Sequence, residues 1–250
     1  MSGVVDGTVV WLTIRQLFAR KRLVASVLFS LAPAIIAALF RAGHGAADPG
    51  APAFLITVFR EIVIGTLLPL AAAVLGTSAF GSEVDDGTVV YLLVRPLARW
   101  RVVMSKYVVA VGATFAIMLP ALLLPWIIVG VGTVPFSQVI GFGAGALAGS
   151  AVYCALFVML GLTSRRSLVV ALLYIVVVEE SLSRNIVGLK SISVREFAVA
   201  VSKAAGVGDS LGGAVSVSMA TVWTMGTIIL VGALLLAVRR LSRYETAEKL

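Results

Sequence analysis

FLITVFREIVIGTLLPLAAAVLGTSAF, residues 54–80, decides the fold, because it is apolar over almost its whole length. A helix needs about 20 apolar residues to cross the hydrocarbon core of a bilayer, and this stretch has enough for a tilted helix. Pro69 is tolerated in such a helix, where it predicts a kink, because neighbouring helices can satisfy the freed carbonyl. The stretch therefore predicts a transmembrane helix.

Five further segments of this kind occur, in a chain that is 60% apolar and only 13% charged. A soluble domain is roughly 45–50% apolar and about 25% charged. We therefore predict an all-α polytopic membrane protein in which residues 1–250 form a single transmembrane domain. The first span exceeds the signal-peptide core of about 7–15 residues, so we expect it to be retained. The six predicted spans are residues 23–40, 54–80, 103–131, 138–161, 167–182 and 219–238.

Lysine and arginine are concentrated on one side of these spans. That side holds Arg15, Arg20, Lys21, Arg22, Arg95, Arg99, Arg101, Lys106, Arg165, Arg166, Arg239, Arg240, Arg243 and Lys249. The positive-inside rule then predicts that both termini and the loop at residues 81–101 are cytoplasmic. Because the cations follow the ends of apolar segments, the net charge of +8 does not indicate nucleic-acid binding.

Two amphipathic segments lie outside the predicted spans. Residues 8–22 place Trp11 and other apolar side chains on one helical face, which predicts a helix in the cytoplasmic interface. A simple juxtamembrane anchor has the same chemistry and stays open. In the extracellular segment 183–218, Ser193 and Glu196 fit a capping box. They predict a short helix packed on the outer end of the bundle, as a structural cap or as a gate.

Four ionisable residues lie near the outer ends of predicted spans: Arg60, Glu61, Glu179 and Glu180. Charges inside a bilayer are costly and often mark a transport path. Near a helix end, however, they can reach water or form a structural ion pair. Both interpretations stay open.

Small residues recur every fourth position in the fourth span, at Gly141, Gly145 and Gly149. This spacing lets two helices approach closely and predicts a packing interface. The same stretch matches a dinucleotide-binding fingerprint only formally, because that motif requires a soluble strand–turn–helix unit. We therefore assign these glycines to helix packing.

Motifs for nucleotide and metal chemistry are absent from the sequence. No P-loop and no H-E-x-x-H motif occurs, and the chain has one histidine and one cysteine. We predict no catalytic residue, no metal site and no cofactor bound by this chain. The pair Asp86-Gly87 also opens the D-G-x-x-A-R core of membrane phosphatidyltransferases, but Val90 and Tyr91 replace its Ala and Arg. An intramembrane lipid-modifying enzyme is therefore the weaker alternative.

The loop between the second and third spans differs from the rest of the chain. Residues 78–106, SAFGSEVDDGTVVYLLVRPLARWRVVMSK, combine acids, a short apolar run, a proline and a basic cluster. Acids suit the positive end of a helix dipole, and Pro96 should end the helix that they begin. The loop thus predicts a short cytoplasmic helix that faces either lipid or a soluble partner.

This loop resembles the one after the second span in type 2 permease subunits of ATP-binding-cassette (ABC) transporters, the type V exporter fold. The matching residues are Phe80, Glu83, Gly87, Thr88, Leu92, Leu93, Pro96, Arg99 and Lys106. The span number and predicted topology fit the resemblance over the whole chain. No ATPase domain is fused to this chain, so the resemblance implies a bacterial half-transporter.

The resemblance implies an exporter subunit in the cytoplasmic membrane of a bacterium. A separate ATPase subunit would bind ATP and Mg²⁺, and a second permease chain and membrane lipids would be the other partners. The short helix would be the coupling helix seated on the ATPase. Its coupling residues would be Glu83, Asp86, Gly87, Thr88, Leu92, Leu93, Pro96 and Arg99. A stand-alone secondary transporter, which would be expected to have inverted repeats, is the main alternative.

Overall fold

The computed structural model describes residues 20–45, 48–85, 99–164, 166–182, 193–208 and 219–246. Side chains are described in a slightly smaller set, residues 28–45, 48–81, 100–164, 166–179, 193–208 and 220–241. Within the described ranges all regular secondary structure is helical. Most of the predicted interfacial helix, residues 8–19, lies outside them.

In the described part of the chain, eight α-helical segments and four π-helical segments follow one another, several of them joined end to end. They are α2 (Arg20–His44), α3 (Ala51–Thr57), η1 (Val58–Leu67), α4 (Leu68–Asp85), α6 (Arg99–Pro125), η2 (Trp126–Gly130), α7 (Phe136–Thr163), α8 (Ser167–Tyr174), η3 (Ile175–Leu182), α10 (Val194–Ser202), η5 (Lys203–Val207) and α11 (Met219–Thr246). α3, η1 and α4 form one continuous helix, because the residues at their junctions keep helical backbone angles.

Four helices in the described part of the chain are long and apolar enough to cross a membrane: Ala51–Gly81, Trp100–Gly130, Phe136–Thr163 and Ala220–Leu241. Two shorter apolar helices, Leu28–His44 and Ser167–Glu179, lie at the first and fifth predicted spans. The chain is therefore a multi-pass membrane protein. The number of six spans and the cytoplasmic position of the termini stay predictions.

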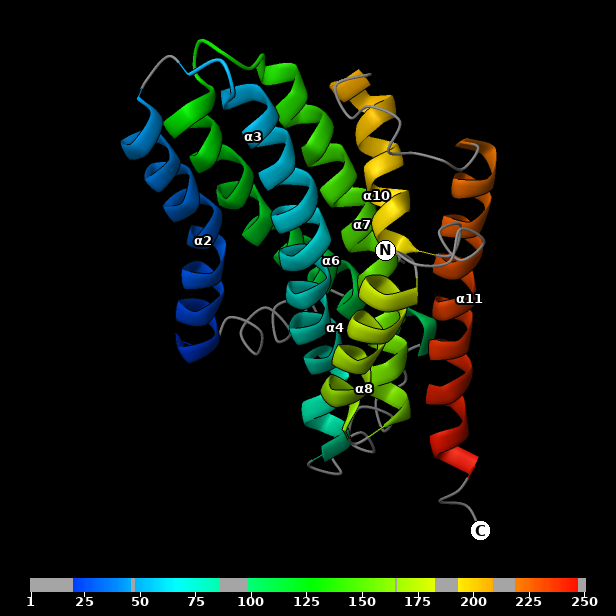
Figure 1. Cartoon of the computed structure of the whole chain (residues 1–250). Coiled ribbons are helices and arrows are strands. Elements are labelled where there is room, and N and C mark those ends of the chain that lie inside the picture. The colour runs from blue at the N-terminus through cyan, green and yellow to red at the C-terminus, as the bar shows by residue number, and fades with distance from the viewer. Residues whose placement is uncertain are drawn as a thin grey trace, which may run out of the picture.

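α7 is the central helix of the bundle. It contacts α4, α6, α8, α10, α11 and η5, and it lies between the α3–α4 helix and α11 in Figure 1. Its glycines bring neighbouring helices close, since a Cβ on Gly161 would lie 2.9 Å from the Thr77 carbonyl oxygen of α4. α2 and α11 occupy opposite edges of the bundle (Figure 1).

The outer surface of the bundle is apolar. Large side chains such as Leu39 of α2, Val169 of α8 and Ile228 of α11 are all more than half exposed. In water such faces would be unfavourable, whereas acyl chains solvate them. These faces are the parts of the helices that lipid or another membrane chain would cover.

α10 is buried along its whole length. Every residue from Val194 to Ser202 except Glu196 is buried, and the helix packs against α7, α11 and η1. We predicted a helix packed on the outer end of the bundle. α10 lies alongside the half of α7 that begins at Phe136, with neighbours on several sides (Figure 1).

Glycine spacing in α7 makes room for α10 and η5. A Cβ on Gly145 would lie 1.9 Å from Ser202 Oγ and 2.4 Å from the Ala198 carbonyl oxygen. A Cβ on Gly141 would lie 2.7 Å from Val207 Cγ2. A Cβ on Gly149 would lie 2.9 Å from the Ala198 Cβ. All three glycines named from the sequence thus face the α10–η5 segment.

We expect Gly145→Ala to destabilise the protein, because the new methyl group meets backbone as well as a side chain. Overpacking of this kind costs about 1–3 kcal/mol. The apparent melting temperature of the detergent-purified protein would therefore fall by several degrees. Gly143→Ala is the matched control, since a Cβ there has no atom within 4 Å. An equal melting temperature for both variants would contradict the close packing of α10.

Candidate functional site

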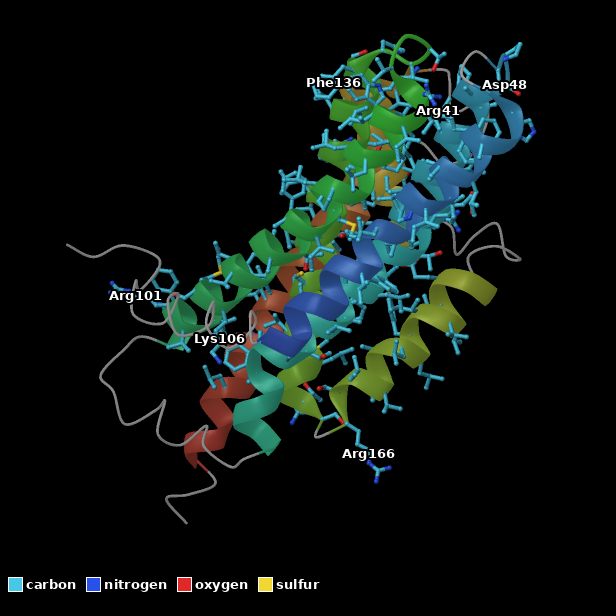
Figure 2. The ribbon with its side chains drawn as sticks, turned by 90° about the vertical axis from the view of Figure 1, so that its left-hand side faces the viewer. Arg41, Asp48, Arg101, Lys106, Phe136 and Arg166 are labelled. Atoms are coloured by element: carbon cyan, nitrogen blue, oxygen red, sulfur yellow. The ribbon has the colours of Figure 1, made fainter. Side chains whose placement is uncertain are left out.

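Basic residues lie at both ends of the bundle. Figure 2 shows Arg101, Lys106 and Arg166 toward one end, and Arg41, Asp48 and Phe136 at the other. The first end also carries the C-terminal end of α4 and the C-terminal end of α11 (Figure 1). The two helix ends that flank the α4–α6 loop therefore lie at this end, which we name the loop end.

Most of the predicted coupling residues lie outside the described part of the chain. Asp86, Gly87, Thr88, Leu92, Leu93 and Pro96 fall there. Glu83 belongs to the last turns of α4, and Arg99 is the first residue of α6. The structure thus describes the two helix ends that flank the predicted coupling loop.

A buried lysine joins these two ends. Lys106 of α6 is only 2% exposed, and its Nζ donates a hydrogen bond of 2.5 Å to the carbonyl oxygen of Ala79 in α4. The same Nζ lies 4.4 Å from the ring centre of Phe80, within the range of a cation–π contact. Phe80 and Lys106 are the first and last residues of the sequence pattern, and they meet in space.

A second group of polar residues lies inside the bundle, between η1, η3 and α10. We name it the polar cluster. Its members are Arg60, Glu61, Glu179, Ser193 and Arg195. Three of the four ionisable residues predicted as a transport path or ion pair belong to it. The side chain of the fourth, Glu180, lies outside the described side chains.

Glu179 holds the N-terminus of α10. Its carboxylate is buried and accepts hydrogen bonds from Ser193 Oγ at 2.6 Å and from the Val194 backbone N–H at 3.0 Å. Ser193 Oγ in turn accepts from the Glu196 backbone N–H at 3.3 Å. The N-terminal N–H groups of a helix stabilise negative charge, which offsets part of the cost of burying this carboxylate.

Arg195 links α10 to η1. Its Nη2 donates a hydrogen bond of 2.5 Å to Glu61 Oε2, and its side chain is only 7% exposed. The guanidinium fits against η1 because residue 65 is glycine: a Cβ there would lie 3.2 Å from both Cζ and Nε of Arg195. The Nε atom is buried and has no hydrogen-bond partner in the described part of the chain.

Arg60 completes the cluster on its more open side. Its Nε lies 3.5 Å from Glu61 Oε1, and both side chains are about one third exposed, at 31% and 38%. Glu61 therefore pairs with both a buried cation, Arg195, and a partly exposed cation, Arg60. An ion pair that is open on one side can be reached by a solute or by water, whereas the Arg195 side of the cluster is closed by protein.

Sequence reasoning found the acids of this cluster but missed its central cation. Arg195 and Glu61 are 134 residues apart, so no local spacing connects them. The capping box at Ser193 predicted where α10 begins. It did not predict that the Glu179 carboxylate accepts hydrogen bonds from the same turn. Among the described residues no group of three or more potential metal ligands occurs, and we assign no cofactor to the cluster.

Comparison with known families gives one match. Residues 18–189 match the family model described as ABC-2 family transporter protein, which is more than half of the chain. The match includes the end of α4, the start of α6 and the η1 and η3 parts of the polar cluster, whereas α10 and α11 lie beyond it. Among curated proteins, none matches this chain.

The ion pairs of Glu61 with Arg195 and with Arg60 can be compared by double-mutant cycles, in which the free energy of unfolding is measured in mixed detergent micelles. The cycle of Glu61→Gln with Arg195→Met should give a coupling energy of about 1–3 kcal/mol, because the Arg195 guanidinium is buried. The matched cycle of Glu61→Gln with Arg60→Met should give less than about 1 kcal/mol, since that pair is partly exposed. Equal coupling energies would contradict the assignment of Arg195 as the structural partner.

Proposed function

The chain belongs to the ABC-2 family of transporter proteins, and we propose that it is the permease subunit of an ABC exporter whose ATPase is a separate subunit. It is a membrane component of a transporter and not itself an enzyme. The observation that carries the proposal is the family match over residues 18–189, which includes the end of α4 and the start of α6. The end of α4 (Figure 1) and Arg101 near the start of α6 (Figure 2) lie at the loop end of the bundle.

In this proposal the loop at residues 81–101 docks on the ATPase from the cytoplasm. The ATPase would bind ATP and Mg²⁺, since this chain has no P-loop. Arg101 and Arg166 at the loop end, and Arg239 and Arg240 near the end of α11, support a cytoplasmic position through the positive-inside rule. Closure of the ATPase would then move helices through α4 and α6.

We further propose that two permease chains act together, surrounded by lipid, in the cytoplasmic membrane of a bacterium. α8 and η3 bury only a narrow stripe, and their other apolar side chains are exposed, which suits contact with a second chain or with lipid. With few charges inside the bundle, an amphipathic substrate fits better than a sugar. The partly exposed Arg60–Glu61 pair is then the polar contact that such a substrate would meet.

We expect the tagged chain to co-purify from the membranes of its own host with a P-loop ATPase, identified by mass spectrometry. Glu83→Lys should lower the recovered ATPase about tenfold, the effect of losing about 1.4 kcal/mol of binding free energy. Asp48→Lys, in the turn at the opposite end, is the matched control and should recover it fully. Transport by the isolated chain without any ATPase would support the secondary-transporter alternative instead.

The predicted orientation can be measured with single cysteines. In a Cys154→Ala background, Asp48→Cys should react with a membrane-impermeant maleimide in intact cells, because we place that turn outside. Arg166→Cys should react only after the cells are opened. Cys154 itself is fully buried, so its replacement should not change accessibility at the other positions. Labelling of position 166 in intact cells would contradict the orientation.

A further inference from the structure

Lys106 has an environment that simple helix packing does not require. Its side chain lies between α4 and α6, where neighbouring residues such as Val103 and Ala110 are fully buried. Burying an ammonium group is costly even when it is hydrogen-bonded, and an apolar side chain of similar length would pack there without that cost. The contacts of this ammonium therefore point to a role beyond filling space.

Those contacts fasten one end of the loop to the other. The Lys106 Nζ reaches the carbonyl oxygen of Ala79, 27 residues earlier in the sequence, and the ring of the next residue, Phe80. A charge-assisted hydrogen bond is stronger and more directional than an apolar contact. Sliding or separation of the two helix ends would leave the buried ammonium without this acceptor, so their relative position is strongly constrained.

The end of α4 also contacts a third helix at this level. A Cβ placed on Gly81 would lie 3.7 Å from Ser167 Oγ, at the start of α8. Ser167 is buried, and the α4 and α8 helices are in contact. A force applied to the loop would thus reach α6 through Lys106. It would reach α8 through the contact between Gly81 of α4 and Ser167.

We propose that Lys106 is a positioning residue that clamps the end of α4 to the start of α6, so that the loop moves both helices together. This inference rests on the proposed function, because it assigns a transmission role to the loop. Lys106 contacts neither ATP nor substrate in this scheme. Its contribution is that movement of the loop shifts whole helices instead of bending the loop relative to them.

The first test is made on the chain alone in lipid nanodiscs, by hydrogen exchange. Lys106→Met keeps the length of the side chain but removes the charge and the hydrogen bond. Amide exchange in residues 79–85 and 99–105 should become about tenfold faster, because the clamp no longer opposes local opening. Lys106→Arg should recover much of the protection, and Arg166→Met, a cation removed at the same end, should leave it unchanged.

The second test uses the complex with its ATPase and a fluorophore on Asp48→Cys at the opposite end, in the Cys154→Ala background. In the otherwise unchanged chain, ATP should change the fluorescence. In Lys106→Met the complex should still assemble and hydrolyse ATP, whereas the fluorescence change should fall about tenfold. If Lys106→Met does not insert, Phe80→Leu removes the ring contact and is tested in the same way.

The outcomes separate the inference from the proposed function. Unchanged exchange and an unchanged fluorescence response in Lys106→Met would overturn the clamp, even if the ATPase binds. Failure of the unaltered chain to bind any ATPase would overturn the proposed function, while the exchange experiment would still test the clamp. Faster exchange with loss of the response, and rescue by Lys106→Arg, would support both.

Discussion

Lipid offers the peptide backbone no hydrogen-bond partner, and the rest of this structure depends on that constraint. Inside the bundle the backbone is helical, and where the helical pattern is locally altered, as in η1, the wider turn still closes its own bonds: the Leu68 N–H bonds to the Val63 carbonyl. Helices that satisfy their own backbone can come very close when their side chains are small. Two glycines of α7 allow such close approach: Gly145 lies against α10, and Gly161 lies against α4.

The same solvent determines where charge can lie. Cations at the loop end can reach the membrane surface, but Arg195, Glu179 and Lys106 are buried and each is held by specific hydrogen bonds. Each of these bonds joins segments that are separate in the sequence. Buried charge in this protein therefore defines which helices belong together and in which register, while apolar packing supplies most of the contact area. The polar cluster and Lys106 act in this way at two different levels of the bundle.

The sequence predicted the helical class and the approximate helix ranges, because apolar runs and turn residues are local signals. The capping box at Ser193 and the glycine spacing of α7 were also local signals: α10 begins directly after Ser193, and Gly141 and Gly145 lie against the α10–η5 segment. The sequence did not predict which residues on distant helices contact one another. Neither the contact of Arg195 with Glu61 nor that of Lys106 with Ala79 has a sequence signature, since each depends on how distant helices are arranged. The burial of α10 was missed for the same reason: its composition resembles that of a surface helix.

α10 has consequences for how the protein is made. Its nine residues, even with η5, are too few to cross a bilayer alone, where about 20 are required. The helix must therefore join the bundle after longer helices have been inserted, and it must find its place among them. Its two acidic anchors, Glu61 and Glu179, precede it in the chain and are synthesised first. We therefore expect the biogenesis of this membrane protein to include a docking step that follows insertion and is guided by charge.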